Sequence, residues 1–384
     1  MPVQPVVKAN AYGHGGVEVA AALEAAGADG LCVATADEAL ELRAAGLRSP
    51  ILVLYPVPAA MAGELADRGV GVTAGDTDLL AELLAAVATP TGSRVGRGRR
   101  RLAVQLEVET GLGRGGFPEG CVVEAAERVA GSPGARLTGL WTHLQAPENE
   151  ALTAAQVGRF EATVRALRAA GHGVPSRHIA ASGGLLLGNA ASLDGVRPGL
   201  TLYGVVPDEL LGSPNLAHVP LRPAMSLHAR PVRVVDLPAG WGISYGPSFV
   251  TARPSRIATL PLGYADGWPR SLSNRASAIV RGRRVPLVGT VAMDAVMADV
   301  TDVPGPPVTA ADEFVLLGRQ GGESITAAEL AAARSTSSWE VVTGMAARLP
   351  RVYHAPSGGL GLRTLVSPPG PTGHRANRRR ANRS

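Results

Sequence analysis

The chain has 384 residues, of which 46% are hydrophobic, so it can bury a large core, and its length favours two domains. No apolar run is long enough to span a membrane, and no charged and then apolar leader opens the sequence, so we predict a cytoplasmic protein without a membrane partner. The net charge of +5 is accounted for by the stretch 373–384, which holds five arginines and no acid, so it does not indicate a nucleic-acid partner.

The two cysteines, Cys32 and Cys121, form neither a CxxC motif nor the regular pattern of a disulfide-rich domain. Such sparse cysteine usage is typical of a reducing compartment. We predict no metal site.

Short β-rich segments alternate with Ala/Leu-rich helices, such as 17–28 and 36–46, from residue 1 to about residue 225. The eight β-rich segments are 3–9, 29–34, 51–57, 69–74, 102–108, 137–143, 176–182 and 195–204. This alternation is typical of βα units around a parallel sheet, and eight of them predict a closed (β/α)8 barrel of the TIM type. The active site of such a barrel lies at the carboxyl ends of its strands.

Over residues 226–358 the pattern changes to period-two alternation punctuated by Gly and Pro, with one late helix over 326–335. The β-rich runs are 225–237, 255–264, 276–289, 296–303 and 313–318. They predict a mainly antiparallel C-terminal β domain. Residues 359–384, which become rich in Pro, Gly, Ser and Arg, are predicted to be a disordered basic tail.

Lysine occurs once, at position 8, although the chain has 37 cationic side chains. Either a general preference for arginine has left one lysine by chance, or this position needs an amine. An amine at a barrel mouth can condense with a carbonyl to form a Schiff base, which a guanidinium cannot do. Other polar side chains follow the ends of later strands: Glu107, Arg114, His143, His178, Ser182 and Arg197.

The segment VVKANAYGHG resembles the motif by which alanine racemases bind pyridoxal phosphate. The resemblance runs from about residue 3 to residue 355 and includes ETGLGR, WTH, HIAAS, VRPGLTLYG, GISYGPSF, LGYADGWPR, VGTVAMD and RLPRVY. It implies a racemase that interconverts L- and D-alanine for peptidoglycan. It also implies a barrel and a β domain in a homodimer whose active sites lie at the subunit interface.

The resemblance further implies a cofactor site. Lys8 would hold pyridoxal phosphate through its amine, and Arg197 would face the pyridine nitrogen. A guanidinium stays protonated and cannot hand that nitrogen a proton, so the ring is a weaker electron sink. The other cofactor-binding positions would be Tyr12, His143, Ser182, Gly199 and Trp339.

Racemisation needs a base on each face of the α-carbon. The resemblance assigns these roles to Lys8 and to Tyr245 of the partner subunit, with His143 near Tyr245 and His178 hydrogen-bonded to Arg197. From the residues alone, Tyr245 also fits a core aromatic before a tight turn.

The substrate carboxylate would be held, by the same resemblance, by Arg114 and the backbone N–H of Met293. An arginine fork suits the bidentate geometry of a carboxylate. Tyr264 would narrow the entrance from the other subunit, and Asp294 directly follows Met293. A narrow entrance favours a substrate with a methyl side chain.

Three positions depart from the family pattern. Many members carry a lysine modified to a carbamate where this chain has Glu107, which can supply the negative charge beside Arg114. Trp339 replaces a tyrosine expected at the phosphate, and Ala181 replaces an amide in HIAAS. Members also carry a longer stretch before the lysine that adds a strand to the β domain. Either the start of this chain is assigned too late or the chain is truncated, and in the second case we expect the β domain to lack one strand partner.

Other functions stay open. Trp339 and Ala181 favour a racemase of the same mechanism with serine or a broader set of amino acids as substrate. A decarboxylase of the same fold is disfavoured because GISYGPSF supplies an opposing tyrosine. A noncatalytic protein that binds pyridoxal phosphate would share the cofactor site and lack turnover.

Overall fold

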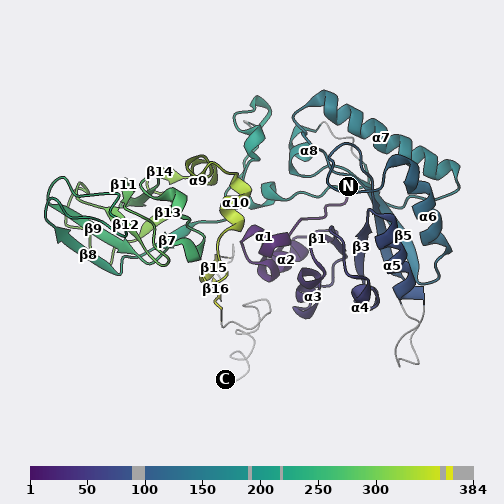
Figure 1. Ribbon diagram of the computed structural model, residues 1–384, viewed down its shortest axis with the longest axis horizontal. Coiled ribbons are helices and arrows are strands. Elements are labelled where there is room, and N and C mark those ends of the chain that lie inside the picture. The colour runs from purple at the N-terminus through teal and green to yellow at the C-terminus, as the bar shows by residue number, and fades with distance from the viewer. Residues whose placement is uncertain (89–99, 189–192, 217–218, 355–359, 366–384) are drawn as a thin grey trace, which may run out of the picture. The chain divides into compact units, whose positions relative to one another are not determined.

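The computed structural model describes residues 1–88, 100–188, 193–216, 219–354 and 360–365 (Figure 1). The chain divides into two compact units: a barrel unit, with residues Met1–Leu202 and Glu209–Val219, and a β unit, with residues Tyr203–Asp208 and Pro220–Ser367. The chain enters the β unit for the last time at Pro220, so the boundary predicted at residue 225 lies a few residues further along. No helix within the described ranges is long and apolar enough to cross a membrane.

Six parallel strands form the continuous sheet of the barrel unit, in the order β1-β2-β3-β4-β5-β6. They are β1 (Leu31–Val33), β2 (Ile51–Val53), β3 (Val70–Ala74), β4 (Leu102–Glu107), β5 (Ala135–Trp141) and β6 (Arg177–His178). Isolated parallel bridges close the ring, because residues 3–6 pair with β1 and with Val196, while Gly195 pairs with His178. The eight predicted segments therefore occupy eight successive places in one parallel ring, which confirms the (β/α)8 barrel.

Helices surround the strands of the barrel unit (Figure 1). They are α1 (Lys8–Tyr12), α2 (Gly16–Ala25), α3 (Ala36–Ala44), α4 (Ala62–Asp67), α5 (Thr77–Ala88), α6 (Val122–Gly131), α7 (Glu150–Ala169) and α8 (Ser182–Leu187), with 3₁₀ turns at 59–61, 119–121, 200–203, 208–210 and 214–216. Helix α3 shows how the sequence sets a boundary: Thr35 and Glu38 form a capping box at its start. Strands β1 and β2 are apolar and buried along their length, as strands covered on both faces require.

The β unit is built on an antiparallel sheet in the order β14-β13-β10-β11-β12-β9-β8, with β7 also paired to β13. Its elements are β7 (Leu227–Ala229), β8 (Arg233–Leu237), β9 (Ser255–Leu260), β10 (Ser277–Val280), β11 (Arg283–Val288), β12 (Val296–Asp299), β13 (Phe314–Gln320), β14 (Glu323–Ile325), α9 (Ala327–Arg334), α10 (Ser338–Thr343) and 3₁₀ turns at 264–266 and 270–272. Ile243, Ile257 and Val288 form a buried apolar cluster in this unit. The predicted mainly antiparallel domain is confirmed.

A separate hairpin corrects the predicted start of the tail. Strand β15 (Arg351–His354) pairs with β16 (Leu360–Arg363), with Arg351 opposite Arg363. The prediction of disorder from residue 359 is wrong for β16, because its backbone finds hydrogen-bonding partners in β15. The rest of the predicted tail, from residue 366, lies outside the described residues.

Candidate active site

The lysine predicted to carry the chemistry begins a left-handed turn at the end of the first barrel segment. The backbone angle φ is positive, between 52° and 55°, at all four residues that follow Lys8. Each L-residue in this conformation costs about 1–2 kcal/mol, because its Cβ crowds the backbone. Such strain persists only where the surrounding structure enforces it, and it concentrates at functional sites.

Two side chains hold this turn in place. Glu38 Oε1 accepts a hydrogen bond from the backbone N–H of Ala9 at 2.6 Å. Asn10 Oδ1 accepts one from the backbone N–H of Gly16, also at 2.6 Å. The first bond therefore fixes the backbone directly after Lys8, and the second ties the turn to the start of α2.

The Lys8 amine lies near a tyrosine ring and an arginine. Lys8 Nζ and Arg114 Cζ each lie 5.8 Å from the centroid of the Tyr55 ring. Burial and the positive charge of Arg114 lower the pKa of Lys8, while the charge of Glu38 opposes this shift. A lowered pKa leaves more of the amine neutral, and the neutral amine is the form that attacks a carbonyl.

Arg114 lies next to the carboxylate that replaces the expected lysine. Its Nη2 is 3.8 Å from Glu107 Oε1, and the Arg114 side chain is 40% exposed. Burial raises the pKa of Glu107, with the charge of Arg114 opposing the shift. The backbone N–H groups of Gly111 and Gly113 donate to Glu109, which shapes the loop that carries Arg114. Arg114 thus has a carboxylate beside it and a solvent-accessible face for another anion.

Arg197 is fully buried in the barrel and donates to Nδ1 of His178. It also donates to the carbonyl oxygens of His178 at 3.1 Å and Thr142 at 2.8 Å, and its Cζ lies 4.8 Å from the Trp141 ring centroid. His178 Nε2 lies 2.7 Å from Gln105 Oε1. Since Nδ1 accepts from Arg197, Nε2 carries the hydrogen and donates to Gln105. The predicted contact between Arg197 and His178 is present.

Burial lowers the pKa of Arg197 to about 10. This value is still well above neutral pH, so the guanidinium stays protonated there. Burial and the charge of Arg197 hold the pKa of His178 well below its usual range. Burial, together with the charges of Arg197, Arg114 and Lys8, lowers the pKa of His143 to about 3. Both imidazoles are therefore neutral hydrogen-bonding groups at physiological pH.

Hydroxyl and amide groups gather at the end of the last barrel segment. Ser182 Oγ accepts from the backbone N–H of Gly199 at 2.9 Å and from Thr201 Oγ1 at 3.1 Å. The Tyr12 hydroxyl faces Gly199, where an added Cβ would stand 2.5 Å from its oxygen. Burial raises the pKa of Tyr12 to about 12, so its phenol keeps a proton to donate. Hydroxyl and backbone N–H donors are suited to a phosphate, so this cluster fits the phosphate of pyridoxal phosphate.

Tyr245 belongs to the β unit and is 75% exposed, so the interpretation as a core aromatic does not hold. It lies in a tight turn between Ser244, with φ of 66°, and Gly246, with φ of 50°. The turn is anchored by Ser244 Oγ, which donates to the carbonyl of Thr290 at 2.6 Å. The phenol is thus presented on a fixed turn at the surface of the unit.

Three other predicted residues of the β unit, Tyr264, Met293 and Asp294, lie on two joined loops. The backbone N–H of Tyr264 donates to Ala292 O at 3.0 Å, next to Met293. Arg348 links the loops, since its guanidinium donates to Asp266 at 2.6 Å and 3.0 Å and to Asp294 at 2.6 Å. Tyr264 and Met293 are 42% and 53% exposed. Both are therefore available to a ligand or a partner.

Trp339 is partly buried in α10, and its carbonyl accepts from Thr343 Oγ1 at 2.6 Å. The start of this helix is fixed by Ser338, whose N–H and hydroxyl donate to Asp208 at 2.7 Å and 2.5 Å. Nine of the predicted residues belong to the barrel unit: Lys8, Tyr12, Glu107, Arg114, His143, His178, Ser182, Arg197 and Gly199. Five belong to the β unit: Tyr245, Tyr264, Met293, Asp294 and Trp339.

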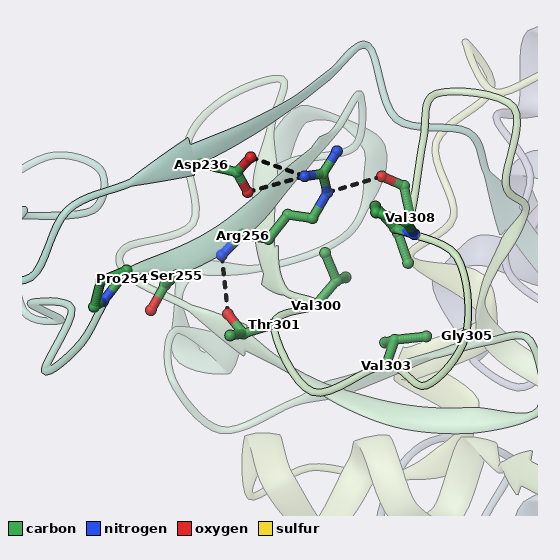
Figure 2. Close-up of a pocket in the computed structure, with 10 residues that line it drawn as sticks. Asp236, Pro254, Ser255, Arg256, Val300, Thr301, Val303, Gly305 and Val308 are labelled. Carbon is green, nitrogen blue, oxygen red and sulfur yellow. Dashed lines mark hydrogen bonds and ion pairs between the residues drawn. The ribbon is translucent and has the colours of Figure 1, made fainter.

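A pocket of about 310 Å³ in the β unit contains none of the predicted site residues. Figure 2 shows an ion pair between two residues that line it: Arg256 Nη1 donates to both carboxylate oxygens of Asp236 at 2.9 Å. Arg256 Nε donates to the carbonyl of Val308 at 3.0 Å. These contacts tie β8 and β9 to the loop before β13, which is a structural role.

Comparisons with known proteins agree with this geometry. Residues 1–207 match the family model described as alanine racemase, N-terminal domain, and residues 224–353 match alanine racemase, C-terminal domain. The chain belongs to the alanine racemase family. This family depends on pyridoxal phosphate, and its members are amino-acid racemases. The family resemblance predicted from the sequence motifs is confirmed.

Individual relatives cover most of the chain. It is 43% identical to the alanine racemase of Symbiobacterium thermophilum over 91% of this chain and 89% of that protein. It is 40% identical to alanine racemase 2 of Caldanaerobacter subterraneus over 91% and 88% of the two chains. The crystal structure of alanine racemase from Bacillus anthracis with bound L-Ala-P has a TM-score of 0.85 and 31% identity, covering 95% of this chain and 91% of that one.

The structure adds residues that sequence reasoning missed. The ring centroid of Tyr55 lies 5.8 Å from both Lys8 Nζ and Arg114 Cζ, and Thr201 joins Ser182 in the hydroxyl cluster. Gln105 had a usable signal, because a polar side chain in the buried strand LAVQLE needs a partner. Tyr55 and Thr201 had no comparable signal in the sequence.

Proposed function

We propose that the protein is an alanine racemase that interconverts L- and D-alanine and supplies D-alanine for peptidoglycan. The observation that carries the proposal is the only lysine of the chain, held on a strained turn with its amine and Arg114 on the same tyrosine ring. An amine can take up pyridoxal phosphate, and an arginine can hold a carboxylate. An amino-acid substrate requires both.

The proposed cofactor-binding residues are Lys8, Tyr12, His143, Ser182, Arg197, Gly199 and Trp339. Tyr12, Ser182 and the Gly199 N–H would hold the phosphate, which their hydroxyl and amide chemistry supports. Arg197, kept protonated, would donate to the ring nitrogen without transferring a proton, and His178 orients it. When bound, pyridoxal phosphate draws electrons from the α-carbon of the attached amino acid and makes its proton acidic.

Two bases would act on opposite faces of the α-carbon. Lys8 Nζ would take or return the proton on one face, which its lowered pKa, caused mainly by burial, supports. Tyr245 Oη of the partner subunit would act on the other face, and its exposure on an anchored turn supports this role. Tyr12 is unsuited to it, because burial raises its pKa to about 12.

Arg114 and the backbone N–H of Met293 would hold the substrate carboxylate. Glu107 would orient Arg114, which the 3.8 Å contact supports. Tyr264 would narrow the entrance and so select a methyl side chain, with its loop held to Asp294 through Arg348. The narrow entrance would be the basis for the preference for alanine.

A homodimer is part of the proposal because the family resemblance assigns one of the two bases, Tyr245, to the partner subunit. Large exposed side chains of the β unit, which include Trp241, Tyr245 and Met293, support an interface there. We place the protein in the cytoplasm, which the two free cysteines support.

A racemase of serine, or of a broader set of amino acids, is the second candidate. It is favoured by Trp339, an indole in place of a phenol, and by Ala181, which leaves α8 without a side-chain cap. Parallel kinetics with L-alanine and L-serine separate the candidates. A kcat/KM ratio above about tenfold in favour of alanine supports the first, and a ratio near or below one supports the second.

The proposal is tested by incubation with L-alanine in deuterated water and analysis of the products. We expect D-alanine with deuterium at the α-carbon. Lys8→Ala abolishes racemisation in both directions, and Tyr245→Phe impairs the conversion of L- to D-alanine most. The control Tyr353→Phe in β15 leaves racemisation intact in both directions. Deuterium in recovered L-alanine without D-alanine would show that only one base works. The absence of both products would show a noncatalytic binding protein.

A further inference from the structure

The carboxylate of Glu38 joins two stretches of backbone at the mouth of the barrel. Its Oε1 accepts from the N–H of Ala9 at 2.6 Å, directly after Lys8. Its Oε2 accepts from the N–H of Ala34 at 2.8 Å and of Thr35 at 3.2 Å, directly after β1. One side chain therefore ties the lysine turn to the neighbouring strand of the ring.

The N–H of Ala9 needs an acceptor from outside its own turn. The N–H of Ala11 donates to Val7 O, and that of Gly13 donates to Ala9 O, both at 2.9 Å. The first N–H groups of a helical turn have no partner within it. Glu38 supplies that partner to Ala9 at the first residue of the strained conformation.

We propose that Glu38 is a positioning residue that fixes the backbone of Lys8 and places a negative charge near its amine. The inference rests on the proposed function, in which Lys8 carries the cofactor and one of the two bases. Glu38 acts through Lys8 and needs no contact with substrate.

The charged groups that act on the Lys8 amine support this role. Burial and Arg114 lower the pKa of Lys8, whereas Glu38, and to a lesser degree Cys32, raise it. A nearby negative charge stabilises the ammonium form. Loss of the charge of Glu38 therefore moves the pKa of Lys8 further down.

Glu38→Gln is the sharpest substitution. It keeps the length of the side chain and removes the charge. An amide has one acceptor oxygen, so it cannot accept from Ala9 on one side and from Ala34 on the other, and its NH2 group faces another N–H. The variant therefore loses both the charge and one anchor.

Glu24 provides a matched control in the same unit. Its Oε2 accepts from the backbone N–H groups of Arg48 and Ser49 at 2.9 Å and 2.7 Å. Glu24→Gln thus also removes a carboxylate that holds two backbone amides. It does so in a loop that carries none of the proposed site residues.

The single lysine allows a direct measurement on the full-length protein freed of cofactor with hydroxylamine. With ¹³Cε-labelled lysine, the NMR spectrum contains one lysine side-chain signal, whose shift against pH gives the pKa of Lys8. We expect the titration of Glu38→Gln to move to lower pH than that of the wild type, and that of Glu24→Gln to match the wild type. An unchanged titration in Glu38→Gln would overturn the inference.

Activity of the cofactor-loaded enzyme gives a second readout. A small displacement of a catalytic group costs about a hundredfold in rate, so kcat of Glu38→Gln falls by about that factor. The KM for alanine stays within about twofold, because Arg114 is not displaced. A fall in kcat shared equally by Glu24→Gln would contradict the positioning role.

Glu38→Asp covers the case in which Glu38→Gln fails to fold. It keeps the charge and can still cap α3, while its shorter side chain weakens the bond to Ala9. We expect the kcat of Glu38→Asp to fall while its Lys8 titration stays close to that of the wild type, and a wild-type kcat would overturn the inference.

The outcomes are separable from the proposed function, because a wild-type protein without racemase activity would refute that function and leave the NMR comparison intact.

Discussion

His178 accepts a hydrogen bond from Arg197 at Nδ1 and donates one from Nε2 to Gln105 at 2.7 Å. Arg197, which can only donate, therefore places the hydrogen of the imidazole on Nε2, and the amide oxygen of Gln105 accepts it. All three side chains are buried, and the chain of donors ends at a neutral oxygen. Arg197 can thus keep its charge, while His178 stays neutral beside it.

Replacement of Gln105 by methionine removes the acceptor and keeps a similar volume. The N–H of His178 is then left buried without a partner, which costs about 1–3 kcal/mol of unfolding free energy. Urea denaturation measures the loss. Gln145→Met, at an exposed position, serves as the control, and an equal effect of both substitutions would refute the assigned hydrogen position.

Acidification destabilises the protein through its neutral imidazoles. The pKa of His143 is lowered to about 3 by burial and by three nearby cations, whereas an unfolded histidine titrates near about 6.5. Below about pH 6.5 the unfolded chain binds a proton that the folded chain does not. The contribution of neutral His143 to the free energy of unfolding is therefore complete above that pH and is lost as the pH falls toward 3. The expected slope is up to about 1.4 kcal/mol per pH unit.

Urea denaturation between about pH 7.5 and pH 4.5 measures this slope. The variant His143→Gln lacks the titrating group and should lose stability less steeply than the wild type over the same range. Parallel curves for the two proteins would show that His143 is protonated in the folded state.

A methyl group at position 199 collides with the Tyr12 hydroxyl. The Cβ of Gly199→Ala would stand 2.5 Å from the oxygen and 3.2 Å from the ring carbon that bears it. Tyr12 must move, and we expect the dissociation constant of pyridoxal phosphate to rise by roughly tenfold or more, which is measured by fluorescence titration.

Tyr12→Phe removes the atom in closest contact. In the double variant Tyr12→Phe/Gly199→Ala, the added methyl group therefore weakens cofactor binding less than Gly199→Ala alone does. Loss of the hydroxyl still leaves the cofactor bound more weakly than in the wild type. Purely additive effects would show that the two residues do not meet.

Arg348 holds two loops of the β unit through the carboxylates of Asp266 and Asp294. Arg348→Leu leaves buried Asp266 without its cation and frees the loops that carry Tyr264 and Met293. We expect the KM for alanine to rise about tenfold with a smaller change in kcat, since substrate placement is what is lost. Steady-state kinetics test this, and Arg348→Lys should raise the KM less because it keeps a cation beside the two carboxylates. An unchanged KM in Arg348→Leu would refute the link.

The sequence predicted the fold well where periodicity is strong. The segment ILV, buried on both faces, could be predicted as a barrel strand because its apolar run lies between turn residues. The segments at 3–6 and 195–196 close the barrel through isolated bridges only, yet their place in the alternation was sufficient. The start of the tail could not be predicted, because β16 depends on its pairing with β15.

The site was predictable in its residue types and less so in its geometry. Lys8 stood out because no other lysine exists. The left-handed turn after it could not be predicted, since Ala9 and Asn10 carry no glycine signal and the conformation depends on Glu38 from another segment. The position of Tyr55 depends in the same way on the folded barrel.

The most direct test of the central claim is reduction of the protein with borohydride in the presence of pyridoxal phosphate, followed by peptide mapping. We expect a stable pyridoxyl group on Lys8, and none in the Lys8→Arg variant. A coloured protein whose Lys8 peptide remains unmodified after reduction would contradict it.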